Sequence, residues 1–410
     1  MAAIRPFCAL RPTPAAAAHV AAVPYDVVTT EEARAQADDN PLSFLRVSRA
    51  EIELPPGADP YSEAVYERAA VNFDRLKKTT MLVDEDPSLY VYRLTRGNHR
   101  QIGLAACFSL DEYDEDLIKK HERTKRDKED DRTRHMLALR AQTGPVFLVY
   151  RAASPIDALT AEAAAGNPLF DFDAADLVRH TVWRVTGAAR DRLVAAFESV
   201  PALYIADGHH RAASAARARN EIRAGATKAG APGNGAESTR FLGVAFPHDQ
   251  AQILPYNRVV KDLGTLSPAD FMKAVGDRFE IVPGAAIPRA RGQIAMYREG
   301  HWHTLTPREG VDPSDPIRSL DVMLLQERLL DPVLNVRDIR TDKRVDFVGG
   351  ARGTGELERL VDSGHAAVAF SLHPVSVDEL MRASDAGDIM PPKSTWFEPK
   401  LRDGLLIHLI

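Results

Sequence analysis

Residues 202–214 of the chain are ALYIADGHHRAAS, and this stretch decides how the rest of the sequence is interpreted. Its first five residues are apolar and predict a buried strand. The alanine-rich residues that follow Arg211 predict a helix. Gly208 lies in the turn between them, and because it has no Cβ, a ligand can approach the backbone there. The stretch therefore predicts a strand, a tight turn and a helix in immediate succession.

The same stretch supplies the donors of a candidate anion site. The N–H groups of a first helical turn have no partners within the helix and lie at the positive end of its dipole. His209, His210 and Arg211 add side-chain donors to that turn, while Asp207 is placed either to cap the helix or to face a metal-bound polyphosphate. The alternative is a capped turn with exposed basic residues. Three successive donors exceed what a cap needs, which favours an anion site.

Composition limits the class of protein. A chain of 410 residues with 45% apolar and 27% charged residues predicts a soluble protein of two or three domains. The net charge of −6 argues against a general nucleic-acid binder. The two cysteines, Cys8 and Cys107, are isolated and fit a reducing compartment. No segment has the length or apolarity of a membrane span. We therefore expect a cytoplasmic protein without a membrane or nucleic-acid partner.

Turn residues and periodicity divide the chain into three expected blocks. These are an N-terminal α/β block with a charged helix (1–154), a phosphate-binding block (155–264) and a C-terminal α/β block (265–410). The clearest expected elements are a helix over 61–77, a hairpin of strands 89–94 and 101–108, a hairpin over 294–305, a helix with a capping box from Ser376 to Glu379, an apolar helix over 320–330 and a terminal strand over 404–410. Residues 225–238 are rich in Gly and Ala and predict a mobile surface loop.

The charged stretch 111–140 has two interpretations. Its segment KKHERTKRDK (119–128) favours a solvated helix with i,i+4 ion pairs. Adjacent positions do not form a helical metal pair, so His121 and Glu122 are not predicted metal ligands. The surrounding cations favour the charged form of Glu122, which suits a carboxylate base as well as an ordinary salt-bridged residue.

A second polar motif is MPPKSTWFEPK, residues 390–400. It lacks the glycines of a phosphate-wrapping P-loop. Its prolines stiffen a segment in which Lys393, Ser394 and Thr395 form a cluster of one cation and two hydroxyls. Such a cluster is suited to hold a phosphate or carboxylate, whereas the alternative is a rigid loop that packs Trp396 and Phe397. We expect both, with the aromatics inward and the polar triplet outward.

These motifs resemble known families. The box DGHHR (207–211) resembles the signature of the ParB/sulfiredoxin-like superfamily. His121-Glu122, the box and PKST (392–395), in this order, resemble the archaeal ADP-dependent free L-serine kinase family. Across nearly its whole length the chain is similar to a bacterial and archaeal family labelled as a domain of unknown function, which RPF (5–7), PYD (24–26), NR (257–258) and the 390–400 motif fit.

The resemblance implies an α+β protein with a ParB/sulfiredoxin-like mixed α/β core and N- and C-terminal α/β extensions. It implies a small-molecule kinase that transfers a phosphoryl group from ADP or ATP, with Mg²⁺, to the hydroxyl of free L-serine or a similar metabolite. The implied catalytic residues are Glu122, His209 and His210; the nucleotide-phosphate residues are Asp207, Gly208, His209, His210 and Arg211; the substrate residues are Lys393, Ser394 and Thr395; and Asp207 is the metal ligand.

Two alternatives stay open. One is a ParB-like switch that binds and hydrolyses CTP or another nucleotide without a metabolite acceptor. The other is a protein that binds an anionic metabolite and does no chemistry. Two departures from the kinase bear on the choice: far more residues separate Glu122 from Asp207, and the N-terminal block has no clear counterpart.

Overall fold

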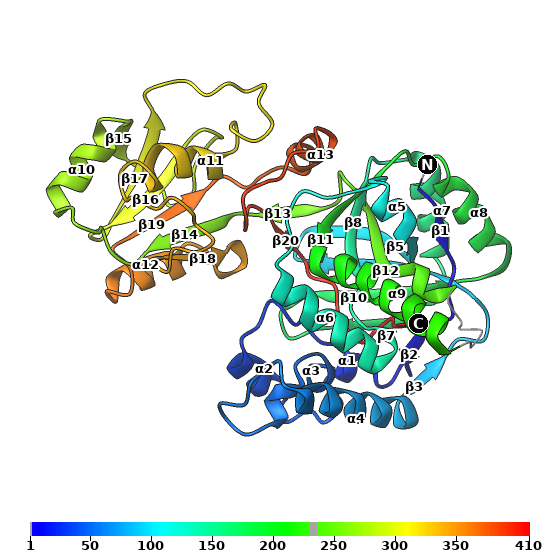
Figure 1. The fold of residues 1–410 in the computed structure, drawn as a ribbon. Helices are drawn as coiled ribbons and strands as arrows, with labels where there is room; N and C mark the ends of the chain where they lie inside the picture. Colours follow the sequence, from blue (N-terminus) through cyan, green and yellow to red (C-terminus); the bar gives the residue numbers. More distant parts are fainter. Residues whose placement is uncertain (1, 230–235) are drawn as a thin grey trace. The chain divides into compact units, whose positions relative to one another are not determined.

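The computed structural model describes residues 2–229 and 236–410, which form two compact units (Figure 1). Unit 1 comprises Met1–Lys120, Thr124–Ala251 and Pro399–Ile410, and unit 2 comprises His121–Arg123 and Gln252–Glu398. Both units combine helices with sheets, in agreement with the α+β prediction. Their bounds differ from those of the three expected blocks because one sheet of unit 1 takes strands from both 1–154 and 155–264.

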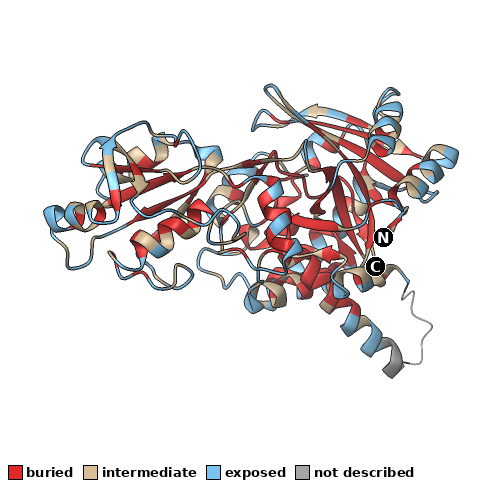
Figure 2. Ribbon diagram, turned by 90° about the horizontal axis from the view of Figure 1, so that it is seen from above, coloured by how far each residue is buried: buried red, intermediate tan, exposed pale blue. Residues whose placement is uncertain are grey.

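A nine-stranded mixed sheet is the centre of unit 1. Its order is β6-β11-β8-β12-β5-β4-β10-β9, and β1 pairs with β5. The bounds are β1 (Ile4–Arg5), β4 (Leu89–Arg96), β5 (His99–Ser109), β6 (Ile118–Lys119), β8 (Val146–Tyr150), β9 (Phe170–Asp173), β10 (Arg179–Val185), β11 (Leu203–Asp207) and β12 (Arg240–Pro247). Every residue of β8 is apolar and buried, as expected for a strand covered on both faces (Figure 2). This covered centre positions the end of β11, the strand beside β8.

Helices and short strand pairs surround this sheet. They are α1 (Ala17–Val20), α2 (Thr30–Ala37), α3 (Leu45–Ser48), α4 (Glu63–Thr79), α5 (Leu110–Asp114), α6 (Arg126–Leu139), α7 (Ser154–Ala163), α8 (Gly187–Phe197), α9 (His209–Ala229), and the pairs β2 (Leu10–Pro12) with β3 (Met81–Val83) and β7 (Ala141–Gln142) with β21 (His408–Leu409). The alanines of α9, among them Ala212 and Ala215, join the core because their short side chains let the helix lie close to the sheet. The α6 helix packs on α9, and Ser214 Oγ donates to Glu129 O at 3.2 Å.

Unit 2 contains a six-stranded antiparallel sheet in the order β15-β17-β16-β19-β14-β18. Its strands are β14 (Tyr256–Val260), β15 (Phe279–Pro283), β16 (Ile294–Arg298), β17 (His301–Pro307), β18 (Val345–Gly349) and β19 (Val368–Leu372). Its helices are α10 (Pro268–Gly276), α11 (Asp321–Leu325), α12 (Gly355–Asp362) and α13 (Val377–Asp385), and β13 (Gln252–Leu254) pairs with β20 (Trp396–Glu398). β14 follows β13 directly in the chain, and β13 pairs with β20, which lies in the 390–400 motif.

Several local predictions are confirmed. The β4–β5 hairpin turns at Gly97 and Asn98, and β16–β17 turns at Glu299 and Gly300. The capping box at the start of α13 has both of its reciprocal hydrogen bonds, between Ser376 and Glu379. In each case adjacent residues determine the structure, which is why the pattern alone predicts it.

Other predictions are wrong or hold only in part. The solvated helix expected over 119–128 does not begin there: β6 and an irregular segment precede α6, which begins only at Arg126. The predicted terminal strand over 404–410 shrinks to β21. The predicted helix over 320–330 is confirmed, although its second half, Gln326–Leu330, is π-helical. The start of the predicted loop 225–238 is the end of α9, and residues 230–235 lie outside the described residues.

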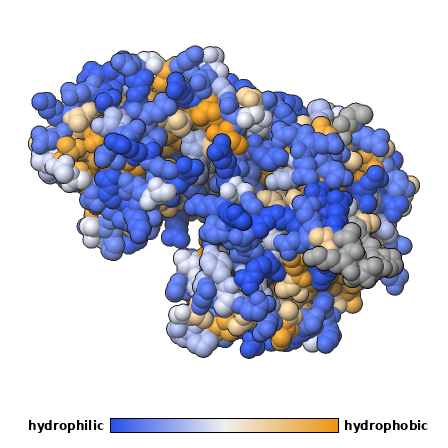
Figure 3. Space-filling model, in the orientation of Figure 1, coloured by the Kyte–Doolittle hydropathy of each residue, from blue (hydrophilic) through white to orange (hydrophobic). Residues whose placement is uncertain are grey.

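The surface is consistent with the composition. On the face drawn in Figure 3 hydrophilic residues predominate and apolar residues are scattered in small groups. Among residues 2–229 and 236–410 no helix combines the length and apolarity needed to cross a membrane.

Candidate functional site

The DGHHR box occupies the predicted junction. β11 ends at Asp207 and α9 begins at His209, with Gly208 between them at a φ of +93°. A Cβ at this glycine would lie 3.3 Å from the Cζ and Nε atoms of Arg211 and 3.5 Å from Val146 Cα. Both the left-handed conformation and the close approach favour glycine. The turn thus packs the Arg211 guanidinium against the strand end instead of leaving it in solvent.

Arg211 is the buried centre of this site in unit 1, with a residual exposure of 7%. Its Nη1 donates to the carbonyl of Pro145. Its Nη2 lies 3.7 Å from Asp207 Oδ2 and 3.8 Å from Asp26 Oδ1. Burial opposes the charge of Arg211, but the neighbouring carboxylates of Asp26, Asp207 and Asp403 outweigh it and raise the Arg211 pKa. The guanidinium is therefore a permanent cation flanked by acids.

Asp207 is held ionised by its neighbours. Lys400 Nζ donates to Asp207 Oδ2 at 3.3 Å. Burial alone would raise the Asp207 pKa, but the charges of Lys400 and Arg211 lower it well below the usual range. The carboxylate at the end of β11 is therefore an anion that faces two cations, one from α9 and one from the C-terminal segment.

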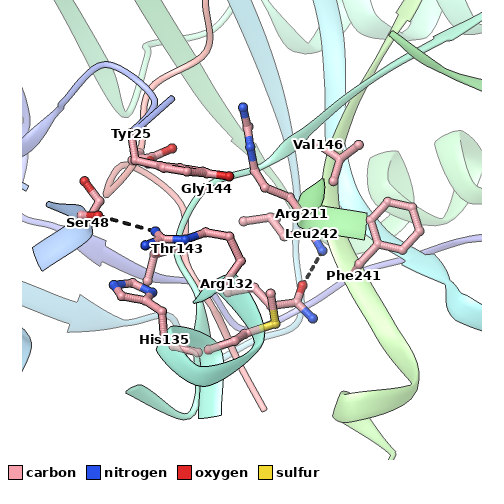
Figure 4. A pocket seen from close by; sticks show the side chains of 14 residues that line it. Tyr25, Ser48, Arg132, His135, Thr143, Gly144, Val146, Arg211, Phe241 and Leu242 are labelled. Atoms are coloured by element: carbon pink, nitrogen blue, oxygen red, sulfur yellow. Dashed lines mark hydrogen bonds between the residues drawn. The ribbon is translucent and has the colours of Figure 1, made fainter. Parts of the chain in front are cut away.

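A group of residues that the sequence motifs do not assign surrounds Arg211. Arg132, on α6, stacks its guanidinium on Tyr25, with Cζ 4.1 Å from the ring centroid, and its Nη1 donates to Ser48 O at 3.3 Å (Figure 4). Asp131 pairs with Arg132 at 2.8 Å. The sequence points to PYD (24–26) only as a family match and favours a solvated surface for the charged stretch that contains Arg132, so this grouping is a finding of the structure.

Polar residues beside Arg132 on α6 are buried. The buried positions of this helix include Asp131, Thr133 and His135. Burial and the charge of Arg132 lower the pKa of His135 to about 4, so His135 is a neutral ring that bonds to Val47 O at 3.0 Å.

A small cavity lies between these residues. It has a volume of about 30 Å³, and its polar lining includes Tyr25, Arg132, Thr143, Arg211 and Asp403 (Figure 4). This volume is on the order of what one or two water molecules occupy. The cavity is therefore suited to hydrate the buried charges and is too small for a nucleotide.

The C-terminal segment completes the charged cluster. The backbone of Asp403 pairs with that of Ala22 through N–H···O bonds of 2.9 and 3.2 Å. Burial raises the pKa of Asp403 to about 7, Asp26 adds to the rise, and Arg211 opposes it. Asp403 is thus a carboxyl that changes its charge near neutral pH while it faces the central arginine.

The two histidines of the box have different surroundings. His209 is buried, whereas His210 is half-buried and its Nε2 accepts the N–H of Lys125 at 3.0 Å. This bond ties the residues that precede α6 to the first turn of α9. His210 therefore has a visible positioning role in unit 1, and its catalytic role stays a prediction.

The remaining predicted residues belong to unit 2. The N–H of Met390 donates to His121 O at 2.8 Å, which brings the segment that contains Glu122 beside the 390–395 loop. Two of the three predicted motifs therefore meet within unit 2. The box lies in unit 1, so joint action of all three motifs stays a prediction.

The polar triplet of the loop is only partly turned outward. Lys393 is exposed and Thr395 is half-buried, but Ser394 is buried and its Oγ donates to Pro391 O at 2.7 Å. The expectation that the whole triplet faces outward is therefore wrong for Ser394, because its hydroxyl closes the proline turn. Phe397 is buried as expected.

A larger cavity in unit 1, of about 490 Å³, lies beside α1 and the loop that follows β9. Alanines form much of its wall, and its cation, Arg402, is paired with Asp176 at 2.6 Å. None of the predicted site residues lines it.

Several solved structures are similar to this chain. A conserved hypothetical protein from Pyrococcus furiosus has 14% identity and a TM-score of 0.36, over 74% of this chain and 95% of that chain. A free serine kinase in complex with AMP has 14% identity and a TM-score of 0.36, over 73% and 92%. SbnI with a C-terminal truncation, from Staphylococcus aureus, has 12% identity and a TM-score of 0.39, over 74% and 87%. No curated protein matches the sequence.

One family model matches most of the sequence. It is described as Protein of unknown function (DUF1015) and covers residues 4–323, which include PYD, the box and the NR dipeptide. The chain belongs to the DUF1015 family.

Proposed function

We propose that this protein is a phosphotransferase that uses ADP or ATP to phosphorylate the hydroxyl of free L-serine or a similar small metabolite. The observation that carries the proposal is the junction of β11 and α9, where Asp207, two histidines and Arg211 converge on a helix N-terminus. Phosphoryl transfer needs positioning and charge neutralisation more than covalent chemistry from the protein, and this junction supplies both.

In this proposal unit 1 holds the nucleotide. The N–H groups of the first turn of α9, with His209 and His210, bind the phosphates. Arg211 supplies positive charge from beneath the turn, since its own hydrogen bond goes to the Pro145 carbonyl. Arg132, on α6, adds a second cation across the small polar cavity.

Mg²⁺ is the cofactor we expect, and the residues present fit it. Magnesium prefers oxygen ligands, and Asp207 offers a carboxylate that its neighbours keep ionised. Asp26 lies against the same Arg211 nitrogen and adds a second carboxylate close by. When bound, the ion would supply charge neutralisation for the phosphates.

The acceptor side is assigned to unit 2. Glu122 accepts the proton of the acceptor hydroxyl as that oxygen forms its bond to phosphorus and the bond from phosphorus to the nucleotide's bridging oxygen breaks. The nucleotide then leaves as AMP from ADP, or as ADP from ATP. Lys393, Ser394 and Thr395 hold the acceptor or the transferred phosphate, Ser394 through the shape of its loop rather than its hydroxyl.

Two substitutions test this assignment. Glu122→Gln is expected to lower phosphotransfer at least a hundredfold while leaving nucleotide affinity unchanged, because only the base is lost. Arg211→Lys is expected to weaken nucleotide binding about tenfold or more, since lysine does not reproduce the guanidinium that packs under the turn and bonds to the Pro145 carbonyl. Glu115→Gln, at an exposed residue after α5, is the matched control. Full phosphotransfer in the Glu122 variant contradicts the proposed role of this base.

One observation favours a second candidate. The proposed phosphate-binding residues and their supporting charges all belong to unit 1, so nucleotide binding need not depend on the acceptor loop. This arrangement suits a switch that hydrolyses CTP or another nucleotide on its own. Nucleotide consumption that is independent of any acceptor and survives Glu122→Gln would favour the switch.

A further inference from the structure

Arg258, in the NR dipeptide of the family motif, is the most deeply buried arginine of the described residues. It lies on β14, between β18 and β19, and only 1% of its surface is exposed. Its Nη1 donates to Tyr256 O, and its Nη2 donates to Lys393 O at 3.0 Å. Phe347 lies beside it, with the ring centroid 5.4 Å from Cζ. All of its protein acceptors are therefore neutral carbonyls.

The missing counter-charge distinguishes this arginine from its counterparts. Arginines 211, 219, 298 and 402 are also buried, and each has a carboxylate within 4.0 Å. Across residues 2–229 and 236–410 no carboxylate lies within that distance of Arg258, and its Nε has no hydrogen-bond partner. Burial lowers its pKa to about 10. A buried cation without a partner is costly to the fold, so its presence calls for an explanation.

The Lys393 carbonyl that accepts from Arg258 belongs to the 390–395 loop, which the proposed function assigns to the acceptor. Lys393 adopts a φ of +59°, which is uncommon for a residue with a side chain. The bond from Arg258 fixes the loop at this strained residue. Trp396 packs edge-on against Tyr256 at 5.2 Å, and Lys393 Nζ lies 5.6 Å from the Tyr256 ring centroid. The guanidinium thus holds the loop backbone at Lys393, the residue that carries the loop's ammonium.

We propose that Arg258 is the positioning residue of the 390–395 loop, and that its unneutralised charge, added to the positive charge of Lys393, makes the loop a receptor for a small oxyanion. The oxyanion is a phosphate or an acceptor carboxylate. The field of a buried charge is screened less than that of a surface charge, so it favours an anion at the loop. The inference rests on the proposed function, in which this loop holds the acceptor or its phosphate.

Inorganic phosphate is the first probe, with binding measured by calorimetry and unfolding measured by thermal denaturation. In Arg258→Met an apolar chain of similar length replaces the unpaired cation. We expect phosphate affinity to fall at least tenfold while the melting temperature stays equal or rises, because a buried charge without a partner is removed. A purely structural arginine would give the opposite pair of results, a lower melting temperature with unchanged affinity.

Two further variants keep the test decisive. Arg258→Lys keeps the charge but has no fork to span two carbonyls, so we expect three- to tenfold weaker binding. Wild-type affinity for both phosphate and L-serine in either Arg258 variant overturns the proposal. Arg298→Met, in the same sheet, removes an arginine that is paired with Glu299 at 2.6 Å. It is expected to lower the melting temperature and to leave phosphate affinity unchanged.

A second probe identifies the anion and tests the kinase proposal independently of this inference. L-Serine is titrated in the absence of nucleotide. Loss of serine binding but not phosphate binding in Arg258→Met assigns the site to the acceptor carboxylate, and the reverse assigns it to the phosphate. Arg258-dependent binding without phosphotransfer supports this inference and contradicts the kinase, whereas phosphotransfer with unaltered anion affinity in Arg258→Met supports the kinase and contradicts the inference.

Discussion

Each unit contains a buried arginine that donates to backbone carbonyls, and the two differ in what neutralises them. Arg211 in unit 1 has Asp207 and Asp26 within 4 Å of one nitrogen, and Asp403 close enough to shift its pKa. Arg258 in unit 2 has only carbonyls and an aromatic ring. The first charge is balanced by the protein itself, and the second is not.

The counter-charges determine whether each arginine contributes to stability or to ligand binding. A cation balanced by acids is part of the fold, since removing it leaves carboxylates buried without a partner. A cation without acids adds little to stability and is free to attract a ligand. In the proposed function, unit 1 would therefore bind anions mainly through N–H groups, histidines and Mg²⁺, whereas unit 2 has positive charge to offer directly. Four substitutions test the difference between the two sites.

The largest effect is expected for Arg211→Met. It removes the arginine charge beside Asp207, Asp26 and Asp403 and leaves Lys400 as the remaining cation beside Asp207. Removing one partner of a buried charge cluster costs about 3–5 kcal/mol of unfolding free energy. Chemical denaturation of the variant and the wild type measures this difference. The Arg258→Met protein is the paired sample, with equal or higher stability. Equal losses in the two variants would mean that the counter-charges do not separate the two sites.

Asp403→Asn is expected to act through pH. Burial raises the Asp403 pKa from an ordinary 3.8 to about 7, so the folded protein binds this proton more tightly than the unfolded chain does. Its contribution to stability is then fully present below about pH 4 and is lost as the pH rises through 7. The variant lacks this loss and is expected to gain on the order of 2–4 kcal/mol relative to wild type between pH 4 and pH 8.

Denaturation curves at pH 4, 6 and 8 check this prediction. Nucleotide affinity should follow the same titration, weakening in the wild type above pH 7 as Asp403 becomes an anion beside Arg211, and staying flatter in the variant. Asp38→Asn, at the exposed C-terminus of α2, is the control. A constant stability difference from pH 4 to pH 8 would refute the assigned titration.

Lys393→Gly is expected to separate stability from binding in unit 2. Glycine adopts the positive φ of this position without strain, so the variant should gain up to about 1 kcal/mol. It also loses the ammonium, and phosphate affinity should fall about tenfold. Arg140→Gly, at another positive-φ residue, is the control that gains stability without altering affinity. Unchanged phosphate affinity in Lys393→Gly would remove Lys393 from the site.

The smallest effect is local. His210→Ala removes the acceptor of the Lys125 N–H, so that amide should exchange with solvent faster while global stability changes little. Hydrogen exchange followed by NMR measures it. The amide of Glu129, which donates to Lys125 O at 3.0 Å, is the internal reference. Equal exchange of the Lys125 amide in both proteins would show that the histidine does not hold this segment.

The predictable parts of the fold and the site are those that neighbouring residues determine. The box gives a strand, a turn and a helix because its apolar run, its glycine and its alanines are adjacent. The two hairpins and the α13 cap follow from turn and capping residues in the same way. These local rules suffice to place Asp207–Arg211 at a helix N-terminus from the sequence alone.

The remainder depends on contacts between residues far apart in sequence. Nothing near Asp403 in the sequence indicates that its backbone pairs with Ala22, or that Lys400 reaches Asp207. Likewise, the burial of Arg132 depends on Tyr25, which lies about a quarter of the chain away. Local periodicity carries no information about such pairs, so the charged cluster around Arg211 and the unpaired state of Arg258 emerge only from the fold.

Phosphorus NMR of the purified protein tests directly whether it phosphorylates L-serine. The sample contains Mg²⁺ and L-serine with ADP, ATP or CTP in turn, and a parallel sample omits the serine. The proposed phosphotransferase gives a new phosphomonoester signal that appears only with serine. This signal grows as ADP is converted to AMP, or as a triphosphate is converted to its diphosphate. Nucleotide consumed at the same rate without serine, or no phosphomonoester with any of the three nucleotides, would contradict the proposed function.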